Sequence, residues 1–504
     1  MAIFLVLCYD EIRGIHSGFQ NRNEKSREFY ICMNTIPAGP TAAGGAHPGS
    51  PFLAAAACIA LIGALGTGLF FLRKQHHGKT PDTSGGIVIS TDADGSEAEA
   101  PTEGDGFVMP DTPAADLLHQ AYLLAAGYDY DAAIELLKGS EEFASDPEVI
   151  SAIAEYESAE ATLVRTPISK ITHVFFHTLI ADPSKAFDGD ADQNGYNQVM
   201  TTIDEFNKIL EAMYEKGYVL VKLHDMAYET TDENGNTVMK AGDIMLPPDK
   251  IPFVMSQDDL CYYPYMDGDG FANRLVIGED GKPTCQITLD DGTVTTGDYD
   301  LVPILEKFCE HHPDFSYKGA RAVLAFTGYE GILGYRTSSA YTGSETYEQD
   351  RQAAAEVAQC LRDNGWELAS HSWGHLDLGT VEWDRFQSDT DKWESEVESL
   401  IGPTDIILFP FGADVGDWHP YTMENERFRY LYNAGFRYFC NVDSSQYWVQ
   451  LGDDYLRQGR RNLDGYRMWK DITAEAEGRP RKLDDLFRAE DIFDKSRPTP
   501  VPEM

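Results

Sequence analysis

Short apolar runs alternate with amphipathic segments from about residue 165 to residue 490 of this 504-residue chain. Runs rich in Val, Ile, Leu and Phe are typical of buried strands, and apolar residues spaced three and four apart are typical of helices. The runs lie at 171–177, 218–224, 251–255, 319–326, 366–371, 405–409 and 436–442, and helices are expected between them, for example at 198–216 and 347–364. Because strands that alternate with helices form parallel sheets, the pattern predicts an α/β domain with a mostly parallel sheet.

Two histidines and two carboxylates lie where two of these expected strands end. His371 and His375 are four residues apart, so in a helix or at a strand-to-helix turn both imidazoles can reach one metal ion. Taken alone, such a pair is more often incidental than a ligand pair. The run from Ile251 ends on Asp258 and Asp259. Since neighbouring residues of a strand point to opposite sides, one carboxylate can bind the metal while the other stays free to take a proton.

These motifs resemble those of the polysaccharide deacetylases of the NodB-homology type, carbohydrate esterase family four. The family motif Thr-Phe-Asp-Asp is matched by Ser256-Gln-Asp-Asp259, and His-Ser/Thr-x-x-His by His371-Ser-Trp-Gly-His375. The third motif, Arg-x-Pro-x-Gly after a strand, is echoed by Asp405-Ile-Ile-Leu-Phe-Pro-Phe-Gly412. The fourth, an Asp closely followed by a Trp, is echoed by Asp443-Ser-Ser-Gln-Tyr-Trp448. The resemblance covers about residues 165–490, which we expect to be a catalytic domain.

The resemblance implies a distorted (β/α) barrel with its chemistry at the C-terminal ends of the strands. It implies that Asp259, His371 and His375 bind a divalent metal and that Asp258 is the base that takes a proton from the attacking water. Zn²⁺ suits two imidazoles and a carboxylate best, with Co²⁺ or Ni²⁺ as alternatives. The implied reaction is removal of acetyl groups from an N-acetylated or O-acetylated cell-surface polysaccharide such as peptidoglycan or a chitin-like glycan.

Five residues near the motifs are candidates for binding the polysaccharide: Trp373, Phe411, Gly412, Asp443 and Trp448. Sugar rings stack on flat aromatic faces, so the three aromatic residues are expected to line the substrate groove. Each of them can equally be an ordinary core residue.

The chain departs from the family in three places. Gln257 replaces the usual aromatic residue, Leu408 stands where the arginine that orients the catalytic Asp is expected, and no histidine follows His419. The late Leu-x-His motif that supplies the general acid is therefore absent.

A different histidine must then protonate the departing amine, unless solvent does so. His177 and His224 each close an expected early strand, so in a barrel both would lie on the same rim as Asp258. We favour His224 slightly, because the neighbouring Asp225 can raise the pKa of a histidine toward neutral pH. The alternative is that both are structural histidines bonded to the backbone.

The composition is strongly acidic, with a formal net charge of -43. A chain this acidic repels nucleic acid and anionic lipid, which excludes both as partners, and a neutral acetylated glycan is compatible with it. Much of the charge is also explained as a solvated surface that keeps the protein soluble.

The first part of the chain has a different organisation. Residues 1–51 show no periodicity and are expected to be a disordered tail. Residues 52–72 contain no charge and are long enough to span a bilayer, so we expect a transmembrane helix; a signal peptide is the alternative. The polar, acidic residues 73–113 are expected to be a flexible linker. This order predicts a single-pass cell-membrane protein with an extracellular catalytic domain.

Residues 114–162 space their apolar side chains as in a helical hairpin, with a third helix that starts at Asp146-Pro147. The hairpin resembles a tetratricopeptide unit and would then meet a protein partner; the alternative is a helical stalk packed on the next domain. Residues 491–504 are expected to be a C-terminal tail. The eight cysteines form no Cys-x-x-Cys pair and are expected to be mostly buried thiols.

A second function remains open. The chain could be a non-catalytic, membrane-anchored glycan-binding or scaffold protein that keeps the barrel and its groove. The complete Asp259, His371 and His375 set favours the enzyme, because a scaffold has no need of all three ligands together.

Overall fold

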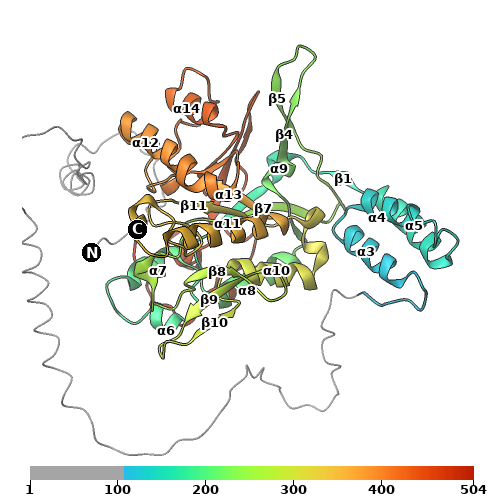
Figure 1. The fold of residues 1–504 in the computed structure, drawn as a ribbon, viewed down its shortest axis with the longest axis horizontal. Helices are drawn as coiled ribbons and strands as arrows, with labels where there is room; N and C mark the ends of the chain where they lie inside the picture. Colours follow the sequence, from blue (N-terminus) through green and yellow to red (C-terminus); the bar gives the residue numbers. More distant parts are fainter. Residues whose placement is uncertain (1–106) are drawn as a thin grey trace, which may run out of the picture. The chain divides into compact units, whose positions relative to one another are not determined.

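The structure, a computed structural model, describes residues 107–504, and a closed barrel of parallel strands is its centre (Figure 1). The barrel strands are β2 (Thr172–Phe176), β7 (Ile251–Gln257), β11 (Val323–Phe326), β12 (Glu367–Ser370), β13 (Ile406–Leu408), β14 (Tyr438–Val442) and β16 (Leu456–Asn462). They pair in the order β7, β11, β12, β13, β14, β16 and β2, and β2 returns to β7. The α/β class and the parallel sheet predicted from the alternation are confirmed.

One expected strand is much shorter than its apolar run. β3 (Tyr218–Leu220) pairs with the first residues of β7, and the chain then turns into the short helix α9 (Leu223–Met226). The end of β7 pairs instead with β11, through Ser256 and Gln257. Thus β3 supports one end of the barrel and does not reach the other.

Helices lie around the barrel and bury their apolar faces against it (Figure 1). They are α8 (Ile203–Glu215), α10 (Leu301–His311), α11 (Tyr347–Asp363), α12 (Trp383–Trp393), α14 (Glu426–Ala434) and α15 (Gly465–Thr473). In α8, Thr202 and Glu205 form a capping box that satisfies free N–H groups of the first turn. Phe206, Ile209 and Met213, spaced three and four apart, fill the space against the sheet.

The barrel interior is apolar at one end and polar at the other. The apolar part includes Val219, Val221, Leu223, Met226, Val254, Val323, Ala325, Ala369 and Leu408, all buried. The carboxyl ends of the strands carry buried polar groups, among them Asp258, His371 and Arg460. Polar side chains therefore gather at the end of the barrel where active sites of such folds form.

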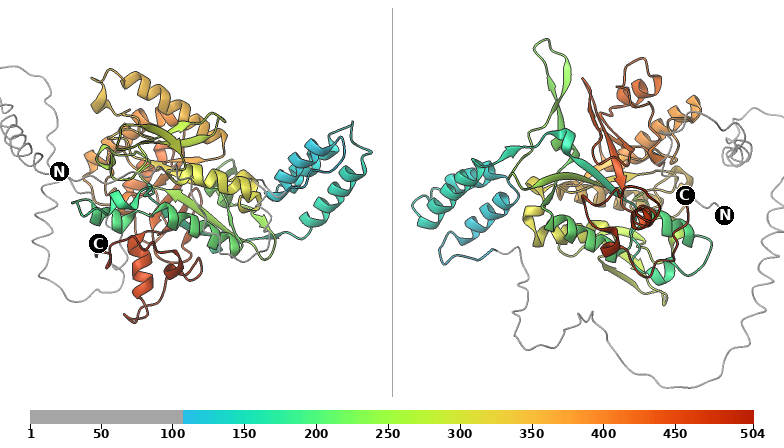
Figure 2. Two further views of the ribbon diagram at one scale, coloured as in Figure 1. Left: turned by 90° about the horizontal axis from the view of Figure 1, so that it is seen from below. Right: turned by 180° about the vertical axis from the view of Figure 1, so that it is seen from behind.

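Smaller elements decorate the barrel. Two antiparallel pairs are β4 (Ala227–Thr231) with β5 (Thr237–Ala241), a ribbon that projects away from the barrel (Figure 1; Figure 2, right), and β1 (Val164–Arg165) with β6 (Met245–Leu246). A meander, β8 (Arg274–Ile277), β9 (Pro283–Thr288) and β10 (Val294–Gly297), lies over α10 and α11, and β15 (Val449–Leu451) flanks β16. The remaining helices are α6 (Pro183–Ala186), α7 (Gln193–Val199), α13 (Ser399–Ile401) and α16 (Ala489–Ile492). Single 3-10 turns occupy Ile168–Lys170, Pro264–Met266, Pro313–Phe315, Tyr317–Gly319, Ser339–Tyr341 and Pro410–Gly412, and Glu394–Glu398 is a π turn.

The expected helical hairpin is present as α3 (Ala115–Ala126), α4 (Tyr130–Lys138) and α5 (Pro147–Glu160). It contacts the barrel domain through hydrogen bonds from the Tyr128 hydroxyl to the Asp314 carbonyl oxygen (2.9 Å) and from the Lys318 N–H to the Gly127 carbonyl oxygen (2.8 Å). The hairpin therefore packs on the barrel domain through its first inter-helix loop.

The expected membrane helix at 52–72 lies outside the described residues, as do the tail 1–51 and most of the linker 73–113. Within 107–504, no helix combines the length and the apolar character needed to cross a membrane.

The last residues are packed, although a tail was expected. Arg497 and Glu205 form an ion pair in which both side chains are fully buried, and Val501 is also buried. The five cysteines of the described part, Cys261, Cys285, Cys309, Cys360 and Cys440, are buried free thiols, as predicted.

Candidate metal centre

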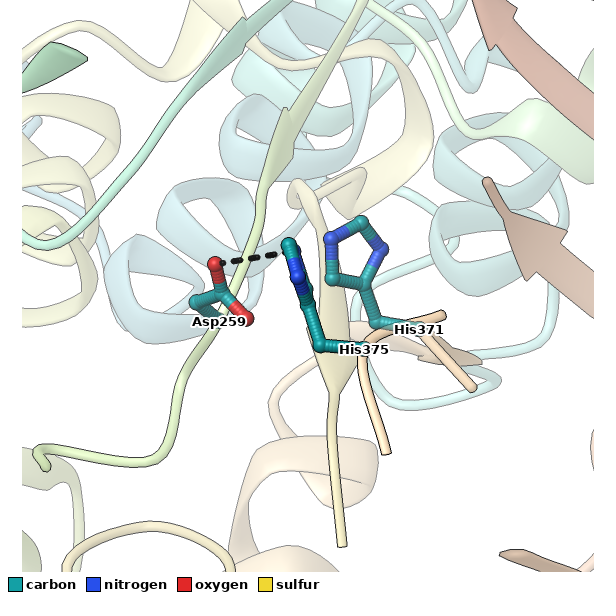
Figure 3. A group of neighbouring side chains, drawn as sticks. All are labelled: Asp259, His371 and His375. Carbon is teal, nitrogen blue, oxygen red and sulfur yellow. Dashed lines mark ion pairs between the residues drawn. The ribbon is translucent and has the colours of Figure 1, made fainter. Parts of the chain in front are cut away.

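Asp259, His371 and His375 meet at the carboxyl end of the barrel (Figure 3). Asp259 follows β7, and His371 directly follows β12, with His375 four residues further along the same loop. One ligand atom from each residue lies within 4.8 Å of the others. Two imidazoles and a carboxylate at this spacing are a donor set that suits a divalent metal with an open position. The residues fit the metal that the sequence predicts.

The backbone at this centre is strained. Asp259 has φ 58°, His375 φ 50° and Phe411 φ 58°, so non-glycine residues adopt the left-handed conformation on three loops. Each such residue costs about 1–3 kcal/mol and persists only where the surroundings enforce it. Clustered strain of this kind is typical of binding and catalytic sites.

A hydrogen bond orients His371, and burial acts on His375. The Nδ1–H of His371 donates to the Leu408 carbonyl oxygen at 2.7 Å, which leaves Nε2 with a lone pair for a metal. The Nε2 atom of His375 lies 3.6 Å from Asp259 Oδ2. Burial lowers the pKa of His375 to about 4, more than the nearby Asp259 charge raises it. His375 is therefore uncharged at neutral pH.

Asp258 lies beside this group, with Oδ2 3.8 Å from His371 Nε2, and its other oxygen pairs with an arginine that the sequence did not point to. Arg460 Nη1 donates to Asp258 Oδ1 at 2.6 Å, and the arginine is fully buried. Burial raises the pKa of Asp258, but the charge of Arg460 and its hydrogen bond outweigh this effect and lower the pKa to about 2. Arg460 thus makes the contact expected of the arginine that Leu408 replaces. The available signal was a run with three arginines, Leu456–Asn462, in an otherwise acidic chain.

Tyr263 holds Asp259 in place. Its hydroxyl donates to Asp259 Oδ1 at 2.9 Å and lies 2.8 Å from Thr327 Oγ1, on the loop after β11. The second carboxylate oxygen, Oδ2, is the one that faces His375. The tyrosine therefore orients the carboxylate and leaves one oxygen directed to the metal position.

Gln257 braces the turn that carries both aspartates. Its amide nitrogen donates to both oxygens of the buried Asp300, at 2.9 and 3.0 Å. Asp300 also accepts hydrogen bonds from the Tyr262 hydroxyl and from the Leu179 N–H. The departure from the family's aromatic residue at position 257 is thus matched by a polar partner.

His177 lies at the end of β2, on the same rim. Its Nδ1 lies 3.1 Å from the Val199 carbonyl oxygen and therefore carries the proton of that hydrogen bond, which leaves Nε2 as the atom free to exchange a proton.

The expectation that His224 shares this rim is wrong. Its Nδ1 lies 2.5 Å from Glu367 Oε1 and its Nε2 lies 2.9 Å from Asp405 Oδ1. Glu367 is the first residue of β12, whereas His371 follows the last, so His224 is at the opposite end of the barrel. The reason is the early end of β3, after which α9 turns beneath the barrel.

The candidate substrate residues have different surroundings. Phe411 packs edge-on against His375, with ring centroids 4.5 Å apart, and Gly412 adjoins Val442 so closely that a Cβ would lie 2.6 Å from its side chain. Phe411 therefore borders the metal centre, whereas the close neighbour of Gly412 is Val442 on β14.

The other three have partners outside the group of metal ligands. Trp373 donates from its indole N–H to Glu396 and lies under Lys392, which makes it part of the packing against α12. Trp448 lies against Arg457, and Asp443 accepts a hydrogen bond from the Ser445 N–H.

No family model and no curated protein matches the sequence. Among solved structures, the chain is similar to the Streptococcus pyogenes deacetylase PplD in complex with acetate, at 15% identity and a TM-score of 0.33. This likeness covers 58% of the present chain and 93% of that chain. So distant a likeness carries no weight for function, which we take from the geometry of the site itself.

Proposed function

We propose that the protein is a metal-dependent hydrolase that removes acetyl groups from an acetylated cell-surface polysaccharide, such as peptidoglycan or a chitin-like glycan. One observation carries the proposal. Asp259 lies with His371 and His375, while the adjacent Asp258 has one oxygen bound by Arg460 and the other 3.8 Å from His371 Nε2. The two neighbouring carboxylates are thereby divided between binding a metal and handling a proton.

Asp259, His371 and His375 would hold the metal, for which Zn²⁺ is the best match and Co²⁺ or Ni²⁺ are alternatives. When bound, it supplies a Lewis acid for the acetyl carbonyl and makes water more acidic. The same attack serves an amide or an ester, so N- and O-acetyl groups are both candidate substrates.

Asp258 is placed to take the proton of the attacking water. Its pKa of about 2 keeps the carboxylate ionised throughout the neutral range, ready to accept a proton. A carboxylate with so low a pKa is a weak base, so the water must be acidified before the transfer. Arg460 keeps Asp258 Oδ1 engaged, and Asp258 Oδ2, 3.8 Å from His371 Nε2, is the oxygen that faces the reaction.

We propose His177 as the general acid in place of His224. A departing amine needs a proton at the rim, and His177 presents Nε2 there while Val199 holds Nδ1. His177→Gln is expected to lower the maximal rate of amide cleavage at least about tenfold, the usual range for loss of a general acid, with metal content unchanged. An unchanged rate would remove His177 from the mechanism.

His224→Gln is the matched control. It should leave the maximal rate of amide cleavage unchanged and lower the melting temperature of the protein. Burial lowers the pKa of His224, but Asp405 and Glu367 outweigh it and raise the pKa to about 10. A histidine whose pKa is raised on folding contributes stability fully below its unfolded pKa of about 6.5 and loses it as the pH rises through 10. The melting temperatures of wild type and variant should therefore differ at pH 6 and converge near pH 10.

An aromatic stack beside Asp259 supports a saccharide substrate. Tyr263 stacks on Tyr265 and on Tyr329, with ring centroids 5.4 and 5.5 Å apart. Tyr265 is 41% exposed and ends the stack toward solvent. A flat ring in this position can pack against the apolar face of a sugar next to the acetylated unit.

The test is acetate release from peptidoglycan and from acetylated chitooligosaccharides of increasing length, with the full chain loaded with metal. Tyr265→Ala should raise KM roughly three- to tenfold on the longer oligosaccharides, for about 0.5–1.5 kcal/mol of stacking, and leave a small acetyl ester unaffected. Tyr228→Ala, on the projecting ribbon and similarly exposed, is the control. Equal kinetics on all chain lengths would reject the stack as a sugar site, and no acetate from any substrate would reject the activity.

The alternative, a glycan-binding scaffold, predicts binding of the same oligosaccharides without acetate release. The proposal has three further parts, which rest on the sequence. They are a membrane anchor at residues 52–72, an extracellular position of the catalytic domain, and a protein partner at the α3–α5 hairpin. Protease added outside intact cells should cut the domain.

A further inference from the structure

A row of buried polar groups lies inside the barrel beneath Asp258. It consists of His173 on β2, Ser256 on β7, and Gln458 and Arg460 on β16, each at most 1% exposed. The three strands are neighbours, with His173 paired in register with Arg460 and Phe175 with Ser256. Buried polar groups are retained only when they are hydrogen-bonded, so the direction of each bond can be followed.

The direction is set at Gln458. Its amide nitrogen donates to the Ile171 carbonyl oxygen at 3.1 Å, so its oxygen faces His173 Nδ1, also at 3.1 Å. An amide oxygen only accepts, and His173 Nδ1 must therefore carry the proton. Burial, reinforced by the charge of Arg460, holds the pKa of His173 well below its usual value. The ring is neutral, and its Nε2 is an acceptor.

The remaining bonds follow from that acceptor. The Ser256 hydroxyl lies 2.9 Å from His173 Nε2 and must donate to it. Its oxygen is then free to accept from Arg460 Nη1 at 3.2 Å, and the same Nη1 donates its other hydrogen to Asp258 at 2.6 Å. Each of these hydrogens therefore has one acceptor, from Gln458 to Asp258.

The guanidinium depends on this row for its position. Its Nε contact with the Asn441 carbonyl oxygen is long, at 3.4 Å, and its Nη2 has no hydrogen-bond partner among the described residues. The Arg460 Cζ atom lies over the Phe175 ring, 4.5 Å from the ring centroid. This contact limits the tilt of the guanidinium more than its rotation. Ser256 is thus the neutral group that fixes Nη1 against Asp258.

We infer that Gln458, His173 and Ser256 are positioning residues that act through Arg460 to orient the Asp258 carboxylate. The inference rests on the proposed hydrolase function. It assigns no chemistry to the three residues, because none of them reaches the reaction centre. The hydrogen-bonded row replaces the support that a motif arginine on the β13 strand would provide.

Ser256→Ala should lower kcat roughly tenfold, within the effect of a small misplacement of a reacting group, with KM and metal content unchanged. In an Arg460→Met background the same substitution should have no further effect on kcat, because the group it acts through is gone. Ser256→Thr, which keeps the hydroxyl, should restore kcat to within about twofold. Ser316→Ala is the control, since Ser316 is also buried and contacts an arginine, Arg321, away from the site.

A second measurement does not use activity. The ¹⁵N spectrum of His173 should show a neutral ring protonated at Nδ1, and Gln458→Met should shift the tautomer and lower kcat non-additively with Ser256→Ala. Two results would overturn the inference while acetate release stands. One is an equal loss of kcat from Ser256→Ala in the wild type and in Arg460→Met, and the other is a His173 ring protonated at Nε2. Absence of acetate release in the wild type would instead reject the proposed function, and the positioning role with it.

Discussion

His371→Ala is expected to abolish metal binding and to lower acetate release by at least about a hundredfold, since even residues that only support a metal ligand change affinity 10- to 100-fold. His371 is buried, and its Nδ1 donates to the Leu408 carbonyl oxygen, so Nε2 is the ligand atom that the variant removes. His375→Ala should behave in the same way. Metal content of the purified full chain, about one ion per chain in the wild type, is the direct measurement.

Asp258→Asn is the contrasting variant. It should keep the metal and lose about 10²–10⁴-fold in kcat, as expected when a base is removed without a ligand. Loss of metal in Asp258→Asn together with its retention in Asp259→Asn would show that the two carboxylates have exchanged roles. Full metal occupancy in both histidine variants would reject the site.

The metal centre could be predicted because its residues follow strands that local pattern reveals. The runs ending at Asp258, Asp259 and His371 are apolar, and parallel strands bring their carboxyl ends together. The spacing of His371 and His375 then limits the geometry further. Short-range signals were sufficient for this part of the fold.

β16 could not be found in the same way. Its seven residues, Leu456–Asn462, are all buried, yet Leu456 is the only large apolar residue among them. The pattern that predicts a strand assumes an apolar interior, whereas this strand turns Gln458 and Arg460 into a polar part of the barrel. The partners that make such burial possible, His173 and Asp258, are distant in sequence and cannot be inferred from periodicity.

The misplacement of His224 has a related cause. The run 218–224 is apolar except for Lys222 and His224, but only Tyr218–Leu220 pairs as a strand. Its last apolar residues, Val221 and Leu223, fill the apolar end of the barrel instead of continuing along it. Apolar residues are buried both in a barrel strand and in a segment that closes the end of a barrel. The sequence therefore could not show on which rim His224 would lie.

Arg497→Met is expected to lower the free energy of unfolding by about 3–5 kcal/mol, the usual cost of removing one partner of a buried ion pair. Arg497 donates to both oxygens of Glu205 at 2.6 Å and to the Met200 carbonyl oxygen at 2.6 Å, and neither charged side chain reaches solvent. Without the guanidinium, Glu205 would keep only its contacts to the backbone N–H groups of Thr202 and Asp494.

Denaturant unfolding of wild type and variant measures this difference, and Arg488→Met is the matched control. Arg488 lies 3.7 Å from Asp484 with both side chains about half exposed, so its loss should change the free energy of unfolding by less than about 1 kcal/mol. The effect of Arg497 should also extend to the site. The arginine holds the carbonyl of Met200, next to Val199, whose own carbonyl oxygen accepts the hydrogen bond from His177. If His177 is the general acid, the folded Arg497→Met protein should therefore show a lowered kcat with unchanged metal content. A stability loss below about 1 kcal/mol would mean that residues near 497 do not fasten the domain as their burial indicates.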